Sequence, residues 1–151
     1  MPSKSYNELI VQYSSSDGFL HYANEAEGST LEAGLTQKAA FEGFESGDVE
    51  VIRFFDSSTN DHVFTADSNE IAALRNSAQF VEEGAVFNLL GEAVAGTQAV
   101  HRFFNTETGK HHYTSDQVEI ENFTASAAYS VEGIIGYGGV VDTREIEQVA
   151  S

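Results

Sequence analysis

The sequence predicts an α+β domain that is mainly antiparallel β sheet with short helices, built from three hairpin–helix–strand repeats. The first observation is that RFFDSSTNDHVFT at 53–65 returns as RFFNTETGKHHYT at 102–114, an offset of 49 residues that continues without a gap. The second is a weaker copy near the N-terminus, at an offset of 41 or 42 residues. The third is that strand-like and helix-like segments follow in the same order in each copy.

The length of 151 residues suffices for one domain with a core, and 41% apolar residues are typical of a folded protein. We expect a single domain, 1–151, with units at about 8–48, 49–97 and 98–143 and a polar tail at 144–151. A single unit cannot bury its apolar face alone, so the three are expected to pack together. Closure around a pseudo-threefold axis would also remove exposed sheet edges.

Each unit is expected to begin with a hairpin. The runs VIRFF and AVHRFF are rich in β-branched and aromatic residues, which favour strands. The segments DSSTND and NTETGK consist of turn-forming residues, and HVFT and HHYT read as the returning strands.

A short helix and a last strand are expected to complete each unit. Asp67 is a good N-cap, and Glu70, three residues later, would reach back to it as in a capping box. Asp116 and Glu119 repeat this spacing. The segments QFVEEGAVFNLL and YSVEGIIGYGG then predict the last strands.

The first copy is degenerate. An offset of 42 residues aligns Tyr22 with Phe64, whereas an offset of 41 aligns the Glu-Gly pair at 42–43 with the pair at 83–84. Gln12 stands where the other two copies have an arginine. If the repeated motif binds a ligand, this copy is expected to be weak or inactive.

The net charge of −17, from 24 acidic and 7 basic residues, excludes several partners. Nucleic acid and anionic membrane surfaces require a basic patch, so neither is expected. No apolar run reaches the length of a membrane-spanning helix, so membrane insertion is not expected either. The acidity suits a saline or calcium-rich setting, in which counterions screen the self-repulsion.

The aromatic strand ending in Asn, the Thr-Gly turn, the His-x-Tyr-Thr strand and the later Glu-Gly pair resemble a tandem repeat family of unassigned function. That family occurs in secreted bacterial proteins, beside cell-wall lysozymes and in RTX-type surface proteins. The resemblance implies an accessory module of a larger extracellular protein, without implying one function. Unit two departs from the pattern at Asp56 and Asn60. Unit three matches best, at Arg102, Asn105, Thr108, Gly109, His111, Tyr113, Thr114, Glu132 and Gly133.

The repeated polar and aromatic residues form the candidate ligand-binding set. The arginine would donate hydrogen bonds, the glutamate would accept them, and the aromatic residue would stack against an apolar face, a combination that suits a sugar. The alternative is that each arginine pairs with the glutamate of its own unit and stabilises the fold. Where the arginines point decides between the two. The set is Arg53, His62, Phe64, Glu83, Arg102, His111, Tyr113 and Glu132.

Metal binding and catalysis have weaker support. Asp56, Ser58, Asn60 and Asp67 are spaced loosely like a calcium loop, but Asp61 stands where such a loop needs glycine. His111 and His112 would point to opposite faces of a strand, which disfavours a shared zinc ion. No cofactor is expected, and calcium stays open. No Gly-x-Ser-x-Gly motif occurs, and distinctive residues that recur in each unit favour binding over catalysis.

The sequence therefore predicts a non-catalytic, extracellular binding module. Its expected partner is a glycan or a cell-wall or surface polymer, which makes it a lectin-like adhesion module of a bacterial surface protein. Two alternatives stay open: a peptide- or protein-binding adhesin module, and a structural spacer between neighbouring domains.

Overall fold

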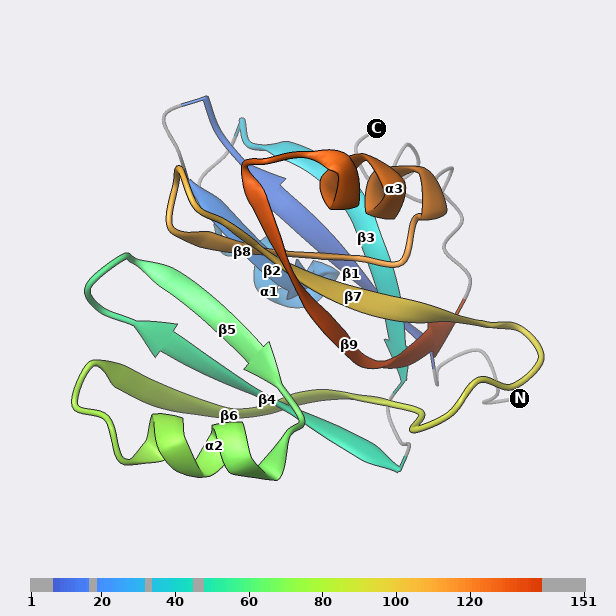
Figure 1. Cartoon of the computed structure of the whole chain (residues 1–151), viewed down its shortest axis with the longest axis horizontal. Coiled ribbons are helices and arrows are strands. Elements are labelled where there is room, and N and C mark those ends of the chain that lie inside the picture. The colour runs from blue at the N-terminus through green and yellow to red at the C-terminus, as the bar shows by residue number, and fades with distance from the viewer. Residues whose placement is uncertain (1–6, 17–18, 32–33, 45–47, 140–151) are drawn as a thin grey trace.

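The computed structural model describes residues 7–16, 19–31, 34–44 and 48–139 (Figure 1), so the expected tail at 144–151 lies outside the described residues. The fold is mostly antiparallel β sheet with short helices, as predicted. The elements in chain order are β1 (Asn7–Ser14), β2 (Leu20–Asn24), α1 (Glu25–Gly28), β3 (Thr36–Phe44), β4 (Val49–Asp56), β5 (Asp61–Thr65), α2 (Ser68–Arg75), β6 (Phe80–Leu89), β7 (Thr97–Asn105), β8 (Lys110–Thr114), α3 (Gln117–Ala125) and β9 (Tyr129–Gly139).

The strands fall into three groups with the same pairing. In group one, β1 lies between β2 and β3; in group two, β4 lies between β5 and β6; and in group three, β7 lies between β8 and β9. The first two strands of each group form the predicted hairpin, and a helix leads from the hairpin to the third strand. All the pairs are antiparallel, and Figure 1 shows α2 and α3 on opposite sides of the molecule.

The third strands join the groups into one nine-stranded sheet. β3 pairs with β6 at Phe44 and Asn88, and it pairs with β9 at Glu42 and Gly139. Leu90, directly after β6, forms a bridge with Tyr137 of β9. Each third strand therefore contacts the other two near its C-terminal end.

Strand register settles the alignment of the first group. Gln12 faces Tyr22 just as Arg53 faces Phe64, so Tyr22 and Phe64, 42 residues apart, hold corresponding places in their hairpins. On the other side, however, Gln12 faces Lys38, whereas Arg53 faces Gly84. The expected match of the Glu-Gly pair at 42–43 with the pair at 83–84 is therefore wrong, because β3 is shifted in register relative to that alignment.

The Glu-Gly pairs of β6 and β9 form β-bulges. Gly84 and Gly133 have φ of 98° and 106°, a left-handed conformation that glycine adopts without strain. The glutamate before each glycine, Glu83 or Glu132, is the extra residue without a partner in the strand register. The bulge thus explains the recurrence of Glu-Gly in the sequence.

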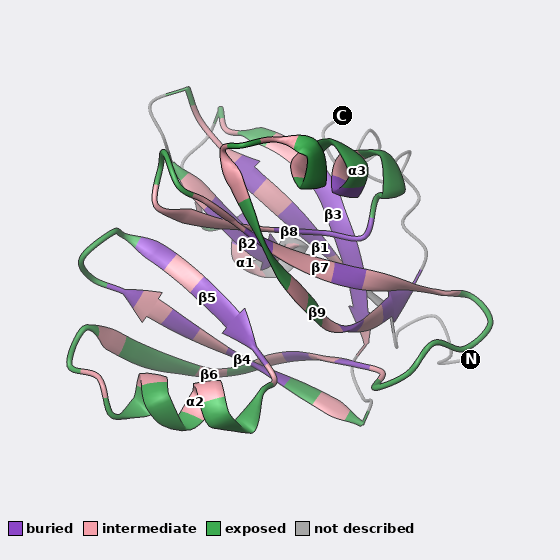
Figure 2. Ribbon diagram, in the orientation of Figure 1, coloured by how far each residue is buried: buried purple, intermediate pink, exposed green. Residues whose placement is uncertain are grey.

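Three aromatic rings, one from each hairpin, meet at the centre of the core. The ring centroids of Tyr22, Phe64 and Tyr113 lie between 4.9 and 6.3 Å apart, each pair edge to face. The Tyr113 hydroxyl accepts a hydrogen bond from Phe64 N at 2.8 Å, and the Tyr22 hydroxyl accepts one from Tyr113 N at 3.1 Å. Figure 2 shows the buried residues concentrated on the strands. None of the described helices is long and apolar enough to cross a membrane.

Candidate functional site

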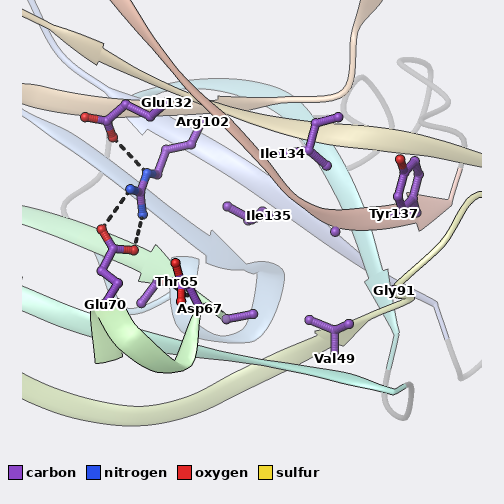
Figure 3. Close-up of a pocket in the computed structure, with 12 residues that line it drawn as sticks. Val49, Thr65, Asp67, Glu70, Gly91, Arg102, Glu132, Ile134, Ile135 and Tyr137 are labelled. Atoms are coloured by element: carbon purple, nitrogen blue, oxygen red, sulfur yellow. Dashed lines mark hydrogen bonds and ion pairs between the residues drawn. The ribbon is translucent and has the colours of Figure 1, made fainter. Parts of the chain in front are cut away.

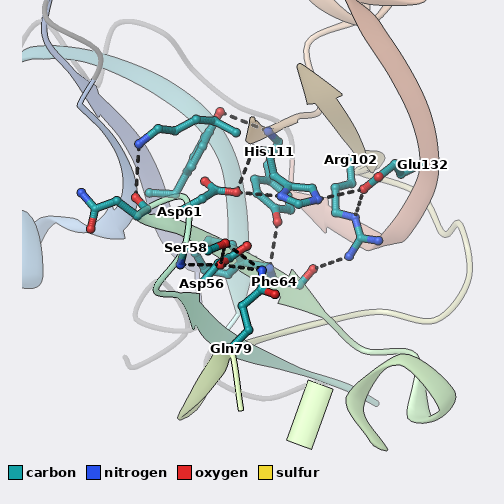
Figure 4. A network of polar contacts seen from close by, with 12 residues as sticks. Asp56, Ser58, Asp61, Phe64, Gln79, Arg102, His111 and Glu132 are labelled. Carbon is teal, nitrogen blue, oxygen red and sulfur yellow. Dashed lines mark hydrogen bonds and ion pairs between the residues drawn. The ribbon is translucent and has the colours of Figure 1, made fainter. Parts of the chain in front are cut away.

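Arg102 lies between two carboxylates that come from different groups. Its Nε donates to Glu132 of β9 at 2.8 Å, and its Nη1 and Nη2 donate to the two oxygens of Glu70 on α2, each at 2.9 Å. Nη1 also donates to the carbonyl of Phe64 at 3.2 Å (Figure 4). The Arg102 side chain is 11% exposed, so it joins groups two and three from the interior.

Arg53 forms the equivalent cluster between groups one and two. Its Nε donates to Glu83 at 2.7 Å, and Nη1 and Nη2 donate to Glu27 of α1 at 2.8 and 2.9 Å. The side chain is 12% exposed. Bidentate contacts of this kind are the strongest that a guanidinium forms with a carboxylate.

Group one has a different cation at this place. Gln12, which replaces the arginine, donates to the Tyr22 hydroxyl at 2.7 Å. Lys38, which faces Gln12 in the register, pairs with Glu119 of α3. The helix glutamates therefore each reach a cation in another group: Glu27 reaches Arg53, Glu70 reaches Arg102, and Glu119 reaches Lys38.

The predicted pairing of Arg53 with Glu83 and of Arg102 with Glu132 is thus present, but the helix glutamates were missed as partners. Asp67 does cap α2 by accepting from Asn69 N at 2.9 Å, as predicted. Glu70 does not complete the expected capping box, because its carboxylate is bound by Arg102, and Asp67 N donates instead to Thr65. A glutamate recurs three residues after the cap in units two and three, and this recurrence could have pointed to the contacts. Glu70 and Glu119 recur because each binds a cation of another group.

The clusters keep Glu27, Glu70 and Glu132 ionised. The hydrogen bonds from Arg53 lower the pKa of Glu27. Burial raises the pKa values of Glu70 and Glu132, but the hydrogen bonds and charges of Arg102 and His111 outweigh burial and lower both. The carboxylates are therefore acceptors at neutral pH.

The two predicted histidines differ in their protonation at neutral pH: His111 is protonated and His62 is neutral. Burial lowers the pKa of His111, but its contacts to Asp61 at 2.7 Å and Glu132 at 3.2 Å outweigh burial and raise the pKa to about 9. For His62, burial and the neighbouring His21 ring, 4.6 Å away, lower the pKa to about 4. His62 Nδ1 is buried without a hydrogen-bond partner among the described residues, whereas His111 Nδ1 contacts Asp61 (Figure 4).

The aromatic members of the predicted ligand set are in the wrong environment for that role. Phe64 and Tyr113 are each 1% exposed and belong to the central aromatic cluster. The prediction that they offer a stacking face to a ligand is therefore wrong, because the meeting of the three hairpins buries both rings.

The acidic turn considered for calcium is occupied by internal contacts. The Asp56 carboxylate accepts hydrogen bonds from Ser58 and from Gln79 Nε2 at 2.9 Å (Figure 4), and Asp67 caps α2. Among residues 7–16, 19–31, 34–44 and 48–139, no group of three or more histidine, aspartate and glutamate side chains is placed to hold a metal ion.

A cavity of about 500 Å³ opens beside the Arg102 cluster, between groups two and three. One end is polar and includes Asp67, Glu70, Arg102 and Glu132, whereas the other end includes apolar residues and Tyr137 (Figure 3). The side chains of Arg102 and Glu132 thus belong both to an internal ion pair and to a cavity wall. The lining residues are Val49, Thr65, Ala66, Asp67, Glu70, Gly91, Arg102, Glu132, Ile134, Ile135, Gly136 and Tyr137.

The sequence matches one protein family over residues 10–139, which includes all three groups of strands. That family is described as a domain of unknown function, DUF5648. No curated protein and no solved structure matches the chain. Because the match extends over most of the chain, the protein belongs to the DUF5648 family.

Proposed function

We propose that the protein is a non-catalytic binding module that recognises carbohydrate in the cavity between groups two and three. The observation that carries this proposal is the division of the cavity into an acidic, hydrogen-bonding end at Glu70 and Glu132 and an apolar end at Ile134 and Tyr137. A volume of about 500 Å³ lies within the range of small-molecule sites.

The chemistry of the polar end supports a ligand rich in hydroxyl groups. Each nitrogen of the Arg102 guanidinium already donates to an internal acceptor, whereas each ionised carboxylate has several lone pairs and can accept further hydrogen bonds. Sugar hydroxyls could donate to these oxygens while the apolar face of the ring lies toward Tyr137. Three carboxylates and one guanidinium line the cavity, so neutral and amino sugars are favoured over acidic sugars.

We further propose that the three groups are copies of one unit arranged around a pseudo-threefold axis. The offset of 49 residues between groups two and three and the equal pairing of their strands support this.

The resemblance to repeats of secreted bacterial proteins supports a place at the cell surface, as part of a larger protein that binds a glycan or cell-wall polymer.

A glycan array followed by titration calorimetry, with and without calcium, tests the carbohydrate proposal. We expect binding of one or more neutral or amino sugars and weaker binding of acidic ones. The variant Ile134→Asp should weaken this binding because Ile134 lines the cavity. Val131→Asp is the matched control, since Val131 lies on the same strand, has a similar exposure and does not line the cavity. The absence of binding to any glycan would contradict the proposal.

A structural spacer is the second candidate. Every guanidinium nitrogen of Arg53 and Arg102 donates to an internal carboxylate, which favours this candidate. It predicts that loss of an arginine destabilises the domain and that no ligand binds.

A further inference from the structure

Two junctions of the molecule have the same polar cluster but very different cavities. At the junction of groups two and three, Arg102 and Glu70 line the cavity of about 500 Å³. At the junction of groups one and two, the corresponding Arg53 and Glu27 line a cavity of only about 60 Å³. The cluster of charges therefore does not by itself decide whether a ligand can enter.

The residues at one strand position differ between the two junctions. Gly136 faces Val100 in the register of group three, and Phe87 faces Val51 in the same way in group two. Both residues line their cavities. Phe87 is 5% exposed, and its ring centroid lies 5.9 Å from that of Phe64. The Phe87 ring thus forms part of the wall of the small cavity, whereas Gly136 brings no side chain to the wall of the large one.

The packing across the junctions explains why glycine stands at 136. A Cβ atom added to Gly136 would lie 2.8 Å from the Cβ of Leu89, closer than real contacts allow. At the other junction, the Cβ of a residue at Gly43 would lie 3.0 Å from the Phe87 ring. Each junction therefore pairs a large residue of β6 with a glycine of the facing strand, but the large residue stands at position 89 in one and at position 87 in the other.

We propose that the contact of Leu89 with Gly136 leaves the site between groups two and three open, because Leu89 does not line the large cavity, and that Phe87 closes the corresponding site of groups one and two. The structure thus assigns one open cavity to these two junctions, although both carry an Arg–Glu cluster. A neutral or amino sugar would bind with one molecule per chain across these two junctions. Only the nature of this ligand rests on the proposed function.

Cysteine reporters test the proposal without a ligand. The chain has no cysteine, so a single introduced thiol can be followed by its rate of reaction with N-ethylmaleimide. Ile135→Cys places the thiol in the large cavity, and Val86→Cys places it in the small one. These two residues are half-buried and precede Gly136 and Phe87, which makes them a matched pair. We expect the thiol at 135 to react several-fold faster than the thiol at 86.

Exchanging the large residue and the glycine at each junction should exchange the reaction rates of the thiols at 135 and 86. Leu89→Gly combined with Gly136→Phe copies the packing of the closed junction, and it should lower the rate at 135 to that at 86. Phe87→Gly combined with Gly43→Leu copies the open junction, and it should raise the rate at 86 to that at 135. Circular dichroism establishes that each variant is folded before its rate is compared.

The outcomes are decisive in each direction. Equal rates at 135 and 86 without the exchanges would overturn the proposal, and this comparison requires no change at the Leu89–Gly136 or Gly43–Phe87 contact. A folded exchange variant with an unchanged rate would overturn it as well. If the rates behave as expected but no glycan binds, the cavity assignment stands and the carbohydrate proposal fails, so the two failures are distinguishable.

Discussion

His62 and His111 hold the same place in their hairpins, yet their surroundings leave His62 neutral and His111 positively charged at neutral pH. His111 has Asp61 on one side of its ring and Glu132 on the other, whereas His62 has the His21 ring and only Glu83 at 3.5 Å. The difference arises where the hairpins meet, because Asp61 of one hairpin reaches the histidine of the next. Ionisation here depends on neighbours that lie in other groups.

The ionisation of His111 predicts a loss of stability at alkaline pH. Its folded-state pKa of about 9 lies above the unperturbed value of 6.5. The stabilisation is therefore complete below about pH 6.5, and it is lost as the pH rises through 9. We expect the free energy of unfolding to fall by about 3 kcal/mol over this range. Urea unfolding of the wild type and of His111→Gln measures it. Equal slopes against pH in the two proteins would show that His111 is not the cause.

The Tyr113 hydroxyl is expected to stabilise the folded state through its hydrogen bond with Phe64 N. In Tyr113→Phe, the N–H of Phe64 would keep its burial but lose its acceptor. We expect a loss of about 1–3 kcal/mol in the free energy of unfolding, because a buried donor without a partner is destabilising. Tyr137→Phe, which changes a half-buried tyrosine of β9 in the same way, is the control and should have a smaller effect. An equal loss in both would refute the role of the hydroxyl.

At the scale of elements, the short helices serve as links between groups. α2 has no fully buried residue, and its apolar residues Ile71 and Leu74 are only half-buried. Its Glu70 nevertheless reaches across to Arg102 on β7, and Glu27 of α1 reaches Arg53 on β4 in the same way. In group one the lysine of β3 substitutes for the missing arginine through Glu119. A cation meets the helix glutamate in all three cases.

Loss of Arg102 tests this role. Arg102→Met would leave Glu70 partly buried without its cation and Glu132 with His111 alone, and we expect the free energy of unfolding to fall by about 3 kcal/mol. Arg75→Met is the matched control, because Arg75 forms a similar pair with Glu82 on the exposed side of α2. That exposed pair should matter much less. Similar losses in the two variants would count against Arg102 as a link between groups.

At the scale of the whole molecule, the three groups share one core. The central cluster takes residues from each group, among them Tyr22, Phe64 and Tyr113, and the third strands join all nine strands in one sheet. No group can therefore expose its core face without exposing that of its neighbours.

This shared core predicts a single cooperative unfolding transition. Urea unfolding followed by tyrosine fluorescence reports on the central rings, and circular dichroism reports on the strands. We expect the two curves to coincide, as in two-state unfolding. Two separate midpoints would instead indicate that one group unfolds independently of the others.

Much of the fold followed from local patterns. The hairpins of groups two and three, the Asp67 and Asp116 caps and the third strands were predicted because turn residues, capping residues and strand-forming runs act over short distances. The register of β3 was not predicted. Gln12 faces Lys38 across the sheet, and this pairing does not follow from the offset between the repeated segments. The burial of Phe64 and Tyr113 likewise depends on how the hairpins meet.

The order of the elements and the repeated arginine, histidine and glutamate can be read from the sequence alone, because these properties are encoded within each segment. The full set of partners of those residues depends on how the groups pack against one another. The helix glutamate that completes each cluster and the Asp61 that charges His111 come from neighbouring groups. The cavity also depends on tertiary packing, because it lies between groups two and three, where Gly136 packs against Leu89, 47 residues away in the chain.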